Sequence, residues 1–217
     1  MTINKILITA GPTYERIDPV RFIGNYSSGK MGIALTQSCL NRGLHVELVL
    51  GPVSEHIYKD LCSPNLHITH VESARQMYEA CIRIYPTVDA AILCAAVADF
   101  TPEVVADQKI KRKGEMTIRL VPTQDIAAAL GQIKQPDQLL AGFALETNDE
   151  EDNARGKMQR KNFDFIVLNS LQDEGAGFRH DTNKITIINK ESKVEYPLKT
   201  KKECADDIVE NMLKTPL

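Results

Sequence analysis

The sequence predicts an α/β fold of Rossmann type: a doubly wound, mainly parallel sheet with a projecting β arm and a C-terminal β-hairpin. In the first half, short apolar segments alternate with helical segments, and right-handed crossovers between such segments build a parallel sheet. Residues 90–95, AAILCA, are apolar throughout, which is typical of a strand covered on both faces. A length of 217 residues suits one ligand-binding domain, residues 1–217.

In the first half, we expect strands at residues 6–9, 45–50, 66–71 and 90–95, and helices at residues 33–42 and 73–84. Ser73 stands where its hydroxyl can cap the second helix. In the second half, we expect strands at residues 115–121, 138–143 and 163–168, helices at 125–133, 153–161 and 201–213, and a loop at 175–178. Residues 184–189 and 193–196 predict a hairpin. We expect this hairpin and residues 109–121 to project from the sheet.

Composition narrows the classes of function. A net charge of −3 argues against a large nucleic-acid interface, and no apolar run reaches the ~20 residues of a membrane span. The first residues predict a strand and not a signal peptide. Five scattered cysteines without a C-x-x-C pair indicate a reducing cytoplasm rather than disulfides or zinc. Metalloprotease, G-x-S-x-G and G-x-G-x-x-G motifs are missing, which disfavours hydrolases, metalloenzymes and NAD dehydrogenases.

The least ordinary stretch is residues 21–32, RFIGNYSSGKMG, directly before the first expected helix. Free N–H groups of such a turn and the positive end of the helix dipole favour an anion, and phosphate is the obvious ligand. The stretch is close to a P-loop, but Met31 replaces the magnesium-binding Ser or Thr and the preceding strand ends too early. An ordinary glycine–serine turn without a ligand remains the alternative.

A second notable loop, residues 96–113, follows the fourth expected strand. Asp99 lies where a carboxylate faces a ligand, and the less favoured alternative is that it caps a helix or a turn. In KIKRK, alternation predicts Lys109 and Lys111 on one face of a strand and Ile110 on the other. We expect a mobile basic arm, about residues 103–121, that closes over a polyphosphate. The alternative is a solvated edge strand whose lysines block aggregation.

Several ordered motifs together resemble the phosphopantothenate–cysteine ligase family of coenzyme A biosynthesis. They are GPTYERIDPVRFIGNYSSGKMG, AAVADF, KIKRK, GFALET and K-x-x-x-K-N-x-D-x-I-V-x-N. No decarboxylase half is present, so the chain resembles the free-standing bacterial form. The resemblance implies a magnesium-dependent ligation of 4'-phosphopantothenate and L-cysteine that consumes CTP through an acyl-cytidylate intermediate. It also implies a cytoplasmic homodimer with its active site near the interface.

The resemblance also assigns residues. Asn25 and Lys109 match the catalytic positions. Substrate binding is implied for Arg21, Ser27, Ser28, Gly29 and Lys30. Nucleotide binding is implied for Ala95, Ala96, Asp99, Lys109, Gln124, Asp125, Ile126, Ala127, Phe143, Lys157 and Lys161. Magnesium ligands are not assigned. The sequence departs from the family pattern at residues 10–12, and at residues 123–126, where a proline before the aspartate is common. The second departure makes the implied contact of Gln124 weaker than that of Asp125.

Two other readings stay open at this point. A non-catalytic nucleotide sensor on the same fold would explain the phosphate loop but not Asn25 or the basic arm. A sugar-nucleotide or NAD-type enzyme is weakened by the missing fingerprint. Only the resemblance favours CTP over ATP, because charge alone does not distinguish the two bases.

Overall fold

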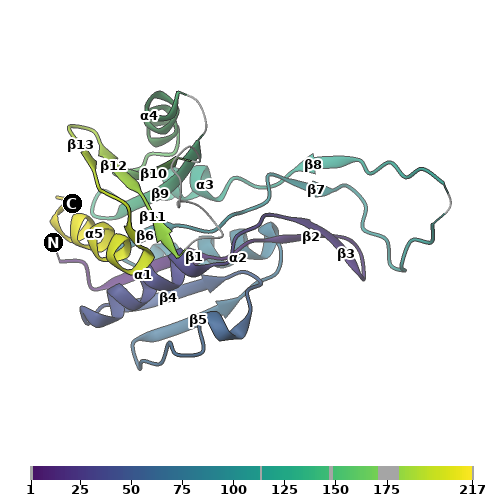
Figure 1. Cartoon of the computed structure of the whole chain (residues 1–217), viewed down its shortest axis with the longest axis horizontal. Coiled ribbons are helices and arrows are strands. Elements are labelled where there is room, and N and C mark those ends of the chain that lie inside the picture. Colours follow the sequence, from purple (N-terminus) through teal and green to yellow (C-terminus); the bar gives the residue numbers. More distant parts are fainter. Residues whose placement is uncertain (1, 113, 147–148, 171–180, 217) are drawn as a thin grey trace.

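An eight-stranded sheet forms the centre of the computed structural model, which describes residues 2–112, 114–146, 149–170 and 181–216 (Figure 1). Its parallel strands are β1 (Lys5–Ala10), β4 (His45–Leu50), β5 (Leu66–His70), β6 (Ala90–Leu93), β9 (Leu139–Glu146) and β10 (Phe165–Ser170). Their spatial order β5-β4-β1-β6-β9-β10 is that of a Rossmann sheet. The predicted fold class is therefore confirmed.

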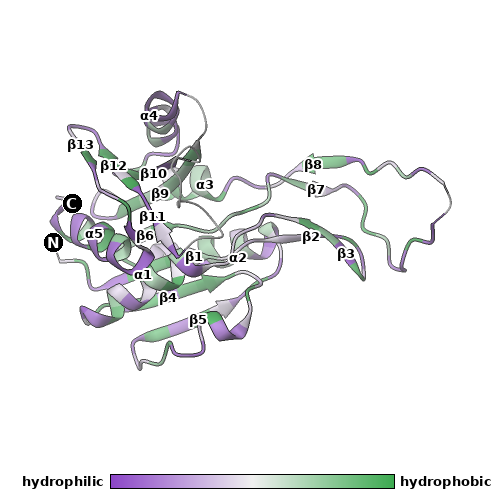
Figure 2. Cartoon of the chain, viewed as in Figure 1, coloured by the Kyte–Doolittle hydropathy of each residue, from purple (hydrophilic) through white to green (hydrophobic). Residues whose placement is uncertain are grey.

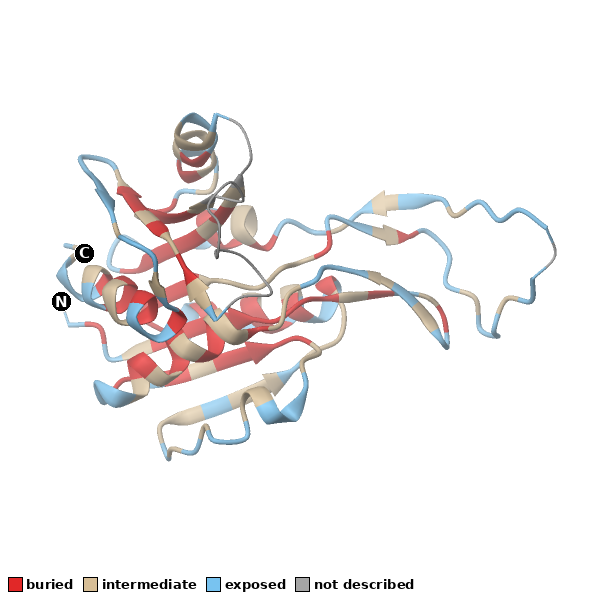
Figure 3. Cartoon of the chain, viewed as in Figure 1, coloured by how far each residue is buried: buried red, intermediate tan, exposed pale blue. Residues whose placement is uncertain are grey.

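Helices cover both faces of this sheet. Helices α1 (Lys30–Asn41) and α5 (Lys201–Lys214) pack on one face, and α2 (Ala74–Ile84), α3 (Ile126–Ile133) and α4 (Glu150–Arg160) pack on the other. Strand β1 supplies both cores, because Ile6 and Ile8 point to one face and Leu7 to the other. Buried residues concentrate in the central strands (Figure 3), which are also the most hydrophobic part of the ribbon (Figure 2).

Helix ends follow the local sequence signals. Ser73 and Gln76 form a capping box at α2, as predicted for Ser73, and Thr200 and Glu203 form another at α5. Asp125 caps α3 by accepting a hydrogen bond from the N–H of Ala128 at 2.9 Å. Short 3₁₀ turns η1 (Glu55–Ile57) and η2 (Tyr85–Thr87) complete the helical elements described.

Two small antiparallel sheets extend away from the central sheet (Figure 1). One joins β2 (Tyr14–Asp18) and β3 (Arg21–Gly24), and the other joins β7 (Phe100–Pro102) and β8 (Leu120–Pro122). The first hairpin was not expected, because its residues lack a continuous apolar face. The predicted projecting arm is present, but residues 109–112 are not a strand. Of the strand expected at residues 115–121, only the end is extended, as part of β8, which pairs with β7.

The C-terminal hairpin forms as predicted, from β12 (Ile185–Asn189) and β13 (Lys193–Glu195), but it does not project. Strand β12 pairs antiparallel with β10 and extends the sheet, because Ile185, Ile187 and Ile188 must be buried. Strands β11 (Thr182–Asn183) and β14 (Lys199–Thr200) pair beside it. The loop predicted at residues 175–178 lies outside the described residues.

The cysteines are free thiols. No helix in the described part of the chain has the length and apolar character that a membrane crossing requires.

Gly32→Ala should destabilise the protein, because its added Cβ would lie 2.3 Å from the Cβ of Ala10 in β1. We expect the free energy of unfolding to fall by about 1–3 kcal/mol in urea titrations, as for an overpacked core. Gly156→Ala is the matched control, because its Cβ meets only the flexible end of Arg160 within α4. Alanine should there be neutral or stabilise by up to about 1 kcal/mol. Equal effects of the two substitutions would contradict the close packing of α1 on β1.

Candidate functional site

A cavity of about 660 Å³ opens at the C-terminal ends of the parallel strands, around β1 and β6. The strand order reverses between these two strands, and such a reversal is where Rossmann sheets bind ligands. Its wall comes from the glycine–serine loop, residues 93–97, the turn before α3, strand β9 and helix α4. The sequence-predicted loops after the first and fourth strands therefore meet at one place.

The glycine–serine loop delivers the N-terminus of α1 to the cavity. The residues predicted to bind substrate in this loop, Ser27, Ser28, Gly29 and Lys30, all line the cavity. Gly29 takes φ 77°, a left-handed conformation that favours glycine, and α1 begins at the next residue. The helix therefore begins at Lys30, not at the predicted residue 33. The first N–H groups of a helix have no partner within the helix, so this wall of the cavity suits an anion.

Asn25 joins the two loops. Its side-chain Nδ2 donates to the carbonyl oxygens of Ala96 at 3.2 Å and Val97 at 3.1 Å. Both protons of the Asn25 amide are thus bound to backbone carbonyl oxygens. To donate to a reacting oxyanion, Asn25 must give up one of these two hydrogen bonds. Asp99 and Ala95 line the same wall.

Buried hydroxyls hold the loop that follows β6. Thr9 accepts hydrogen bonds from the N–H groups of Cys94 and Ala95, both at 3.1 Å, and Thr13 accepts from the N–H of Ala98 at 2.9 Å. The hydroxyl of Thr123 donates to the carbonyl oxygen of Ala98 at 2.7 Å. These bonds fix the backbone on which Asn25 rests.

The opposite wall is formed by the predicted nucleotide residues Gln124, Asp125, Ile126, Ala127, Phe143, Lys157 and Lys161. The Lys157 ammonium donates to the carbonyl oxygen of Phe143 at 2.8 Å, and Lys161 pairs with the carboxylate of Asp125. Burial by itself would raise the pKa of Asp125, but the bonds from Lys161 and Ala128 and the nearby positive charges lower it. Asp125 is therefore ionised near neutral pH.

Positive charge dominates the cavity. Four lysines line it, Lys30, Lys157, Lys161 and Lys201, against the carboxylates of Asp99 and Asp125. Lys201 is only 8% exposed and begins helix α5, where burial and the charge of Lys30 lower its pKa. A cavity with this excess of lysine over carboxylate attracts a polyanion.

Some lining residues were not assigned from the sequence: Thr9, Thr123, Asn169, Asn183 and Lys201. Asn169 lies within a quoted family motif, and its side-chain oxygen accepts from Asn183 Nδ2 at 3.2 Å. Lys201 could have been noticed as a lysine at the first position of a helix, where the dipole disfavours a cation. Thr9 could have been noticed as a hydroxyl in an apolar strand.

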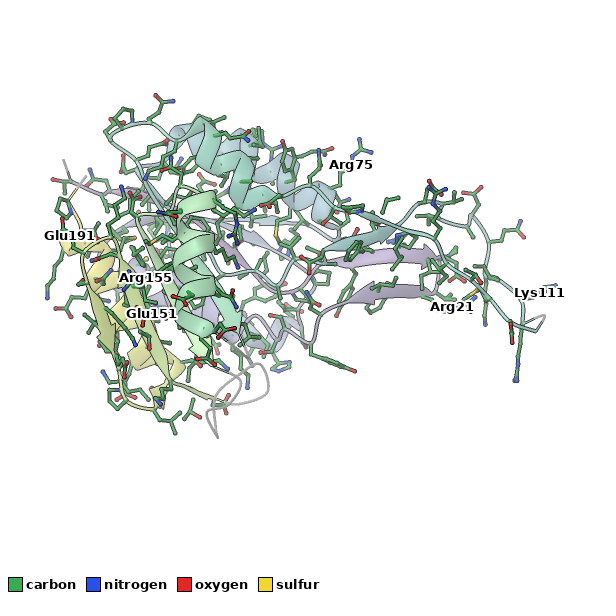
Figure 4. All side chains as sticks on the ribbon, turned by 90° about the horizontal axis from the view of Figure 1, so that it is seen from above. Arg21, Arg75, Lys111, Glu151, Arg155 and Glu191 are labelled. Carbon is green, nitrogen blue, oxygen red and sulfur yellow. The ribbon has the colours of Figure 1, made fainter. Side chains whose placement is uncertain are left out.

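Two predicted residues do not line this cavity. Arg21 lies on the β2–β3 hairpin, and Figure 4 shows it near the far end of the projection that also carries Lys111. Lys109 is exposed in the loop between β7 and β8. Within the chain both residues therefore stand apart from the other predicted site residues. Among the described residues, no group of three or more His, Cys, Asp or Glu side chains could hold a metal ion.

A family model described as the DNA/pantothenate metabolism flavoprotein C-terminal domain matches residues 1–215. The chain belongs to this family. A "Coenzyme A biosynthesis bifunctional protein CoaBC" of Bacillus subtilis is 45% identical over 95% of the chain and 50% of its own length. A prokaryotic relative called "Cysteine/Cysteine sulfinic acid decarboxylase", of unknown organism, is 54% identical over 97% of the chain and 58% of its own length. The chain thus spans little more than half the length of these relatives.

Solved structures agree. The crystal structure of the C-terminal domain of a CoaBC bifunctional protein is 42% identical and superposes with a TM-score of 0.78, covering 96% of this chain and 93% of that one. A Cab2 mutant in complex with phosphopantothenate-cysteine shares the fold, with a TM-score of 0.75 at 16% identity over 96% of this chain and 86% of its own. These findings confirm the resemblance to the phosphopantothenate–cysteine ligase family.

Inorganic tripolyphosphate should bind the cavity and raise the midpoint of thermal unfolding with its concentration. Lys161→Gln should weaken its affinity about tenfold, since one charged hydrogen bond is lost and Asp125 is left without its counter-ion. Lys190→Gln is the control, because Lys190 is exposed in the turn between β12 and β13. Equal affinities of the two variants for tripolyphosphate would show that the polyanion does not bind at this wall.

Proposed function

We propose that the chain is the ligase that joins 4'-phosphopantothenate and L-cysteine, with CTP as the activating nucleotide. The observation that carries the proposal is a lysine-rich cavity at the strand-order reversal, in a member of this family. The coenzyme A names of its relatives and the ligand named for the Cab2 complex support the substrate class.

The proposed chemistry has two displacements. A carboxylate oxygen of phosphopantothenate attacks the α-phosphorus of CTP, the bond to the β-phosphate oxygen breaks, and pyrophosphate leaves. The cysteine amine then attacks the acyl cytidylate, loses a proton and expels CMP. Neither step needs a covalent bond to the protein, so positioning and charge stabilisation provide the acceleration.

The cavity residues divide accordingly. The α1 N-terminus and Lys30 would hold phosphate, and Lys157 and Lys161 would face the nucleotide. The backbone at residues 95–97 and the wall near Phe143 would select the base. The described residues offer no ready-made magnesium cage, so magnesium would be held largely by nucleotide phosphates and water, where it neutralises charge.

We further propose a cytoplasmic homodimer. Exposed large apolar side chains gather on the projections: Val20, Phe22, Phe100, Val104, Val105, Met116 and Leu120. Several large apolar side chains left exposed on the same projections are typical of an interface. Arg21 and Lys109 lie on the same projections, outside the cavity of their own chain. A second copy would bring such cations to a phosphate, which supports an active site near the interface.

Pyrophosphate release tests the function. It should require CTP and phosphopantothenate together, and mass spectrometry should detect phosphopantothenoylcysteine once cysteine is added. Nucleotide binding without turnover would instead identify a sensor. Comparable kcat/KM values for CTP and ATP would contradict CTP specificity.

Asn25→Asp should lower kcat by about 10²–10³-fold, as for loss of an oxyanion-hole donor. A carboxylate cannot donate to the carbonyls of Ala96 and Val97, and it places negative charge where the transition state gains it. Asn41→Asp is the control, because Asn41 only accepts from Gln37 at the far end of α1, which a carboxylate also does. Wild-type turnover in a folded Asn25→Asp protein would show that Asn25 has no role in catalysis.

A further inference from the structure

The two projections of the chain are fastened together at Asp18, the last residue of β2. Asp18 is only 1% exposed, although it lies on a hairpin that extends away from the core. A carboxylate is rarely buried unless all of its oxygens are engaged. Its partners therefore indicate what the burial achieves.

One oxygen of Asp18 closes the hairpin turn. Oδ1 accepts hydrogen bonds from the N–H groups of Val20 and Arg21, both at 2.9 Å. The other oxygen leaves the hairpin. Oδ2 accepts from the Arg21 guanidinium through Nε at 2.9 Å, and through Nη2, and from the N–H of Ile110 at 3.1 Å.

Arg21 completes the link from the other side. Its Nη2 donates to the carbonyl oxygen of Ile110 at 2.7 Å. Both backbone polar groups of Ile110 are thus bound by one ion pair of the neighbouring hairpin. The Arg21 hydrogen bonds lower the pKa of Asp18, so the carboxylate is charged at any physiological pH.

Ile110 lies between Lys109 and Lys111 in the loop predicted to be a mobile basic arm. A second hydrogen bond joins this loop to the β2–β3 hairpin, because Ala106 N–H donates to the carbonyl oxygen of Ile17 at 3.0 Å. The loop is therefore attached to the hairpin on both sides of residue 108, and Figure 4 shows Arg21 of the hairpin and Lys111 of the loop toward the same end of the molecule.

We infer that Asp18 is a positioning residue: its ion pair with Arg21 clamps Ile110 and thereby sets where Lys109 and Arg21 stand together as a phosphate-binding pair. Asp18 itself lines no part of the cavity and touches no reacting atom. The inference rests on the proposed function only for what the pair binds. The clamp itself is a property of the chain.

Limited trypsin digestion tests the clamp without any turnover. In Asp18→Asn, cleavage after Lys109, Lys111 and Arg112 should be about tenfold faster than in the wild type, since the charged hydrogen bonds to Ile110 and Arg21 are lost. Glu103→Gln is the matched control, because its carboxylate pairs with Arg119 at 3.3 Å on the same arm without reaching Ile110. Cleavage of the control should be unchanged. Wild-type cleavage of a folded Asp18→Asn protein would overturn the clamp.

Steady-state kinetics distinguish positioning from mere support. An arm that is already ordered loses less conformational entropy when substrate binds. Asp18→Asn should therefore raise KM about tenfold for CTP or for phosphopantothenate and leave kcat at saturation unchanged. A purely structural role would lower the amount of active enzyme at unchanged KM. Faster cleavage with unchanged KM for both substrates would therefore overturn the positioning role.

Ile110→Pro provides a second variant if Asp18→Asn does not fold. It removes the N–H that reaches Asp18 and restricts the backbone at residues 109 and 110, but it leaves the Asp18–Arg21 pair in the hairpin. Because trypsin does not cut before proline, this comparison uses cleavage after Lys111 and Arg112. That cleavage should be faster and KM should be raised, as in Asp18→Asn, and wild-type values in both would overturn the inference. If the wild-type chain itself releases no pyrophosphate, the proposed function falls, whereas the cleavage comparison still decides the clamp.

Discussion

The close approach of helix α1 to strand β1 is the constraint on which the rest of the site depends. Gly32 faces Ala10 with no room for a side chain, and Gly51 faces the carbonyl oxygen of Pro12, where a Cβ would lie 1.8 Å away. Backbones can meet this closely only because glycine has no Cβ. The packing brings the helix N-terminus to the edge of the sheet. The cavity, its anion-binding wall and the loop contacts of Asn25 follow from that position.

The charges around the cavity are arranged at some cost to stability. Lys201 is buried at a helix N-terminus near Lys30, and each of these conditions disfavours a protonated lysine. Natural proteins retain such unfavourable groups mainly at functional sites. A ligand carrying several negative charges would relieve the repulsion, so its binding and the stability of the fold are coupled.

The projections are stabilised by different interactions from those that stabilise the core. They bury little apolar surface, and their order comes from turn hydrogen bonds, the stacked rings of Tyr14 and Phe22 at 3.8 Å, and the ion pair of Asp18 with Arg21. Polar contacts of this kind depend on each partner, whereas a hydrophobic core tolerates substitution. The arm geometry should therefore be more sensitive to single polar substitutions than the sheet is.

The sequence by itself determined the parallel sheet, its helices and most of the cavity. The pattern of a strand is local, so residues 45–50 were predicted with the bounds that β4 has. Local signals also indicated where α2 and α3 begin. Family motifs brought Asn25, Asp99, Phe143 and the lysines of α4 to one site. These features depend on the spacing of apolar residues and on short motifs, and both can be read from a single sequence.

Only the tertiary structure decided which segments pair across long distances. The β2–β3 hairpin, the pairing of β7 with β8, and the addition of β12 to the sheet each join residues whose patterns allow several partners. The same holds for two residues of the cavity wall. Lys201 reaches it because α5 packs beside α1, and Asn183 lies on β11, which pairs with β14 directly before α5. Asp18 could not be read as a clamp, because its partner Ile110 is 92 residues away and contributes only backbone atoms. A backbone donor leaves no trace in the residue type, so folding alone reveals the contact.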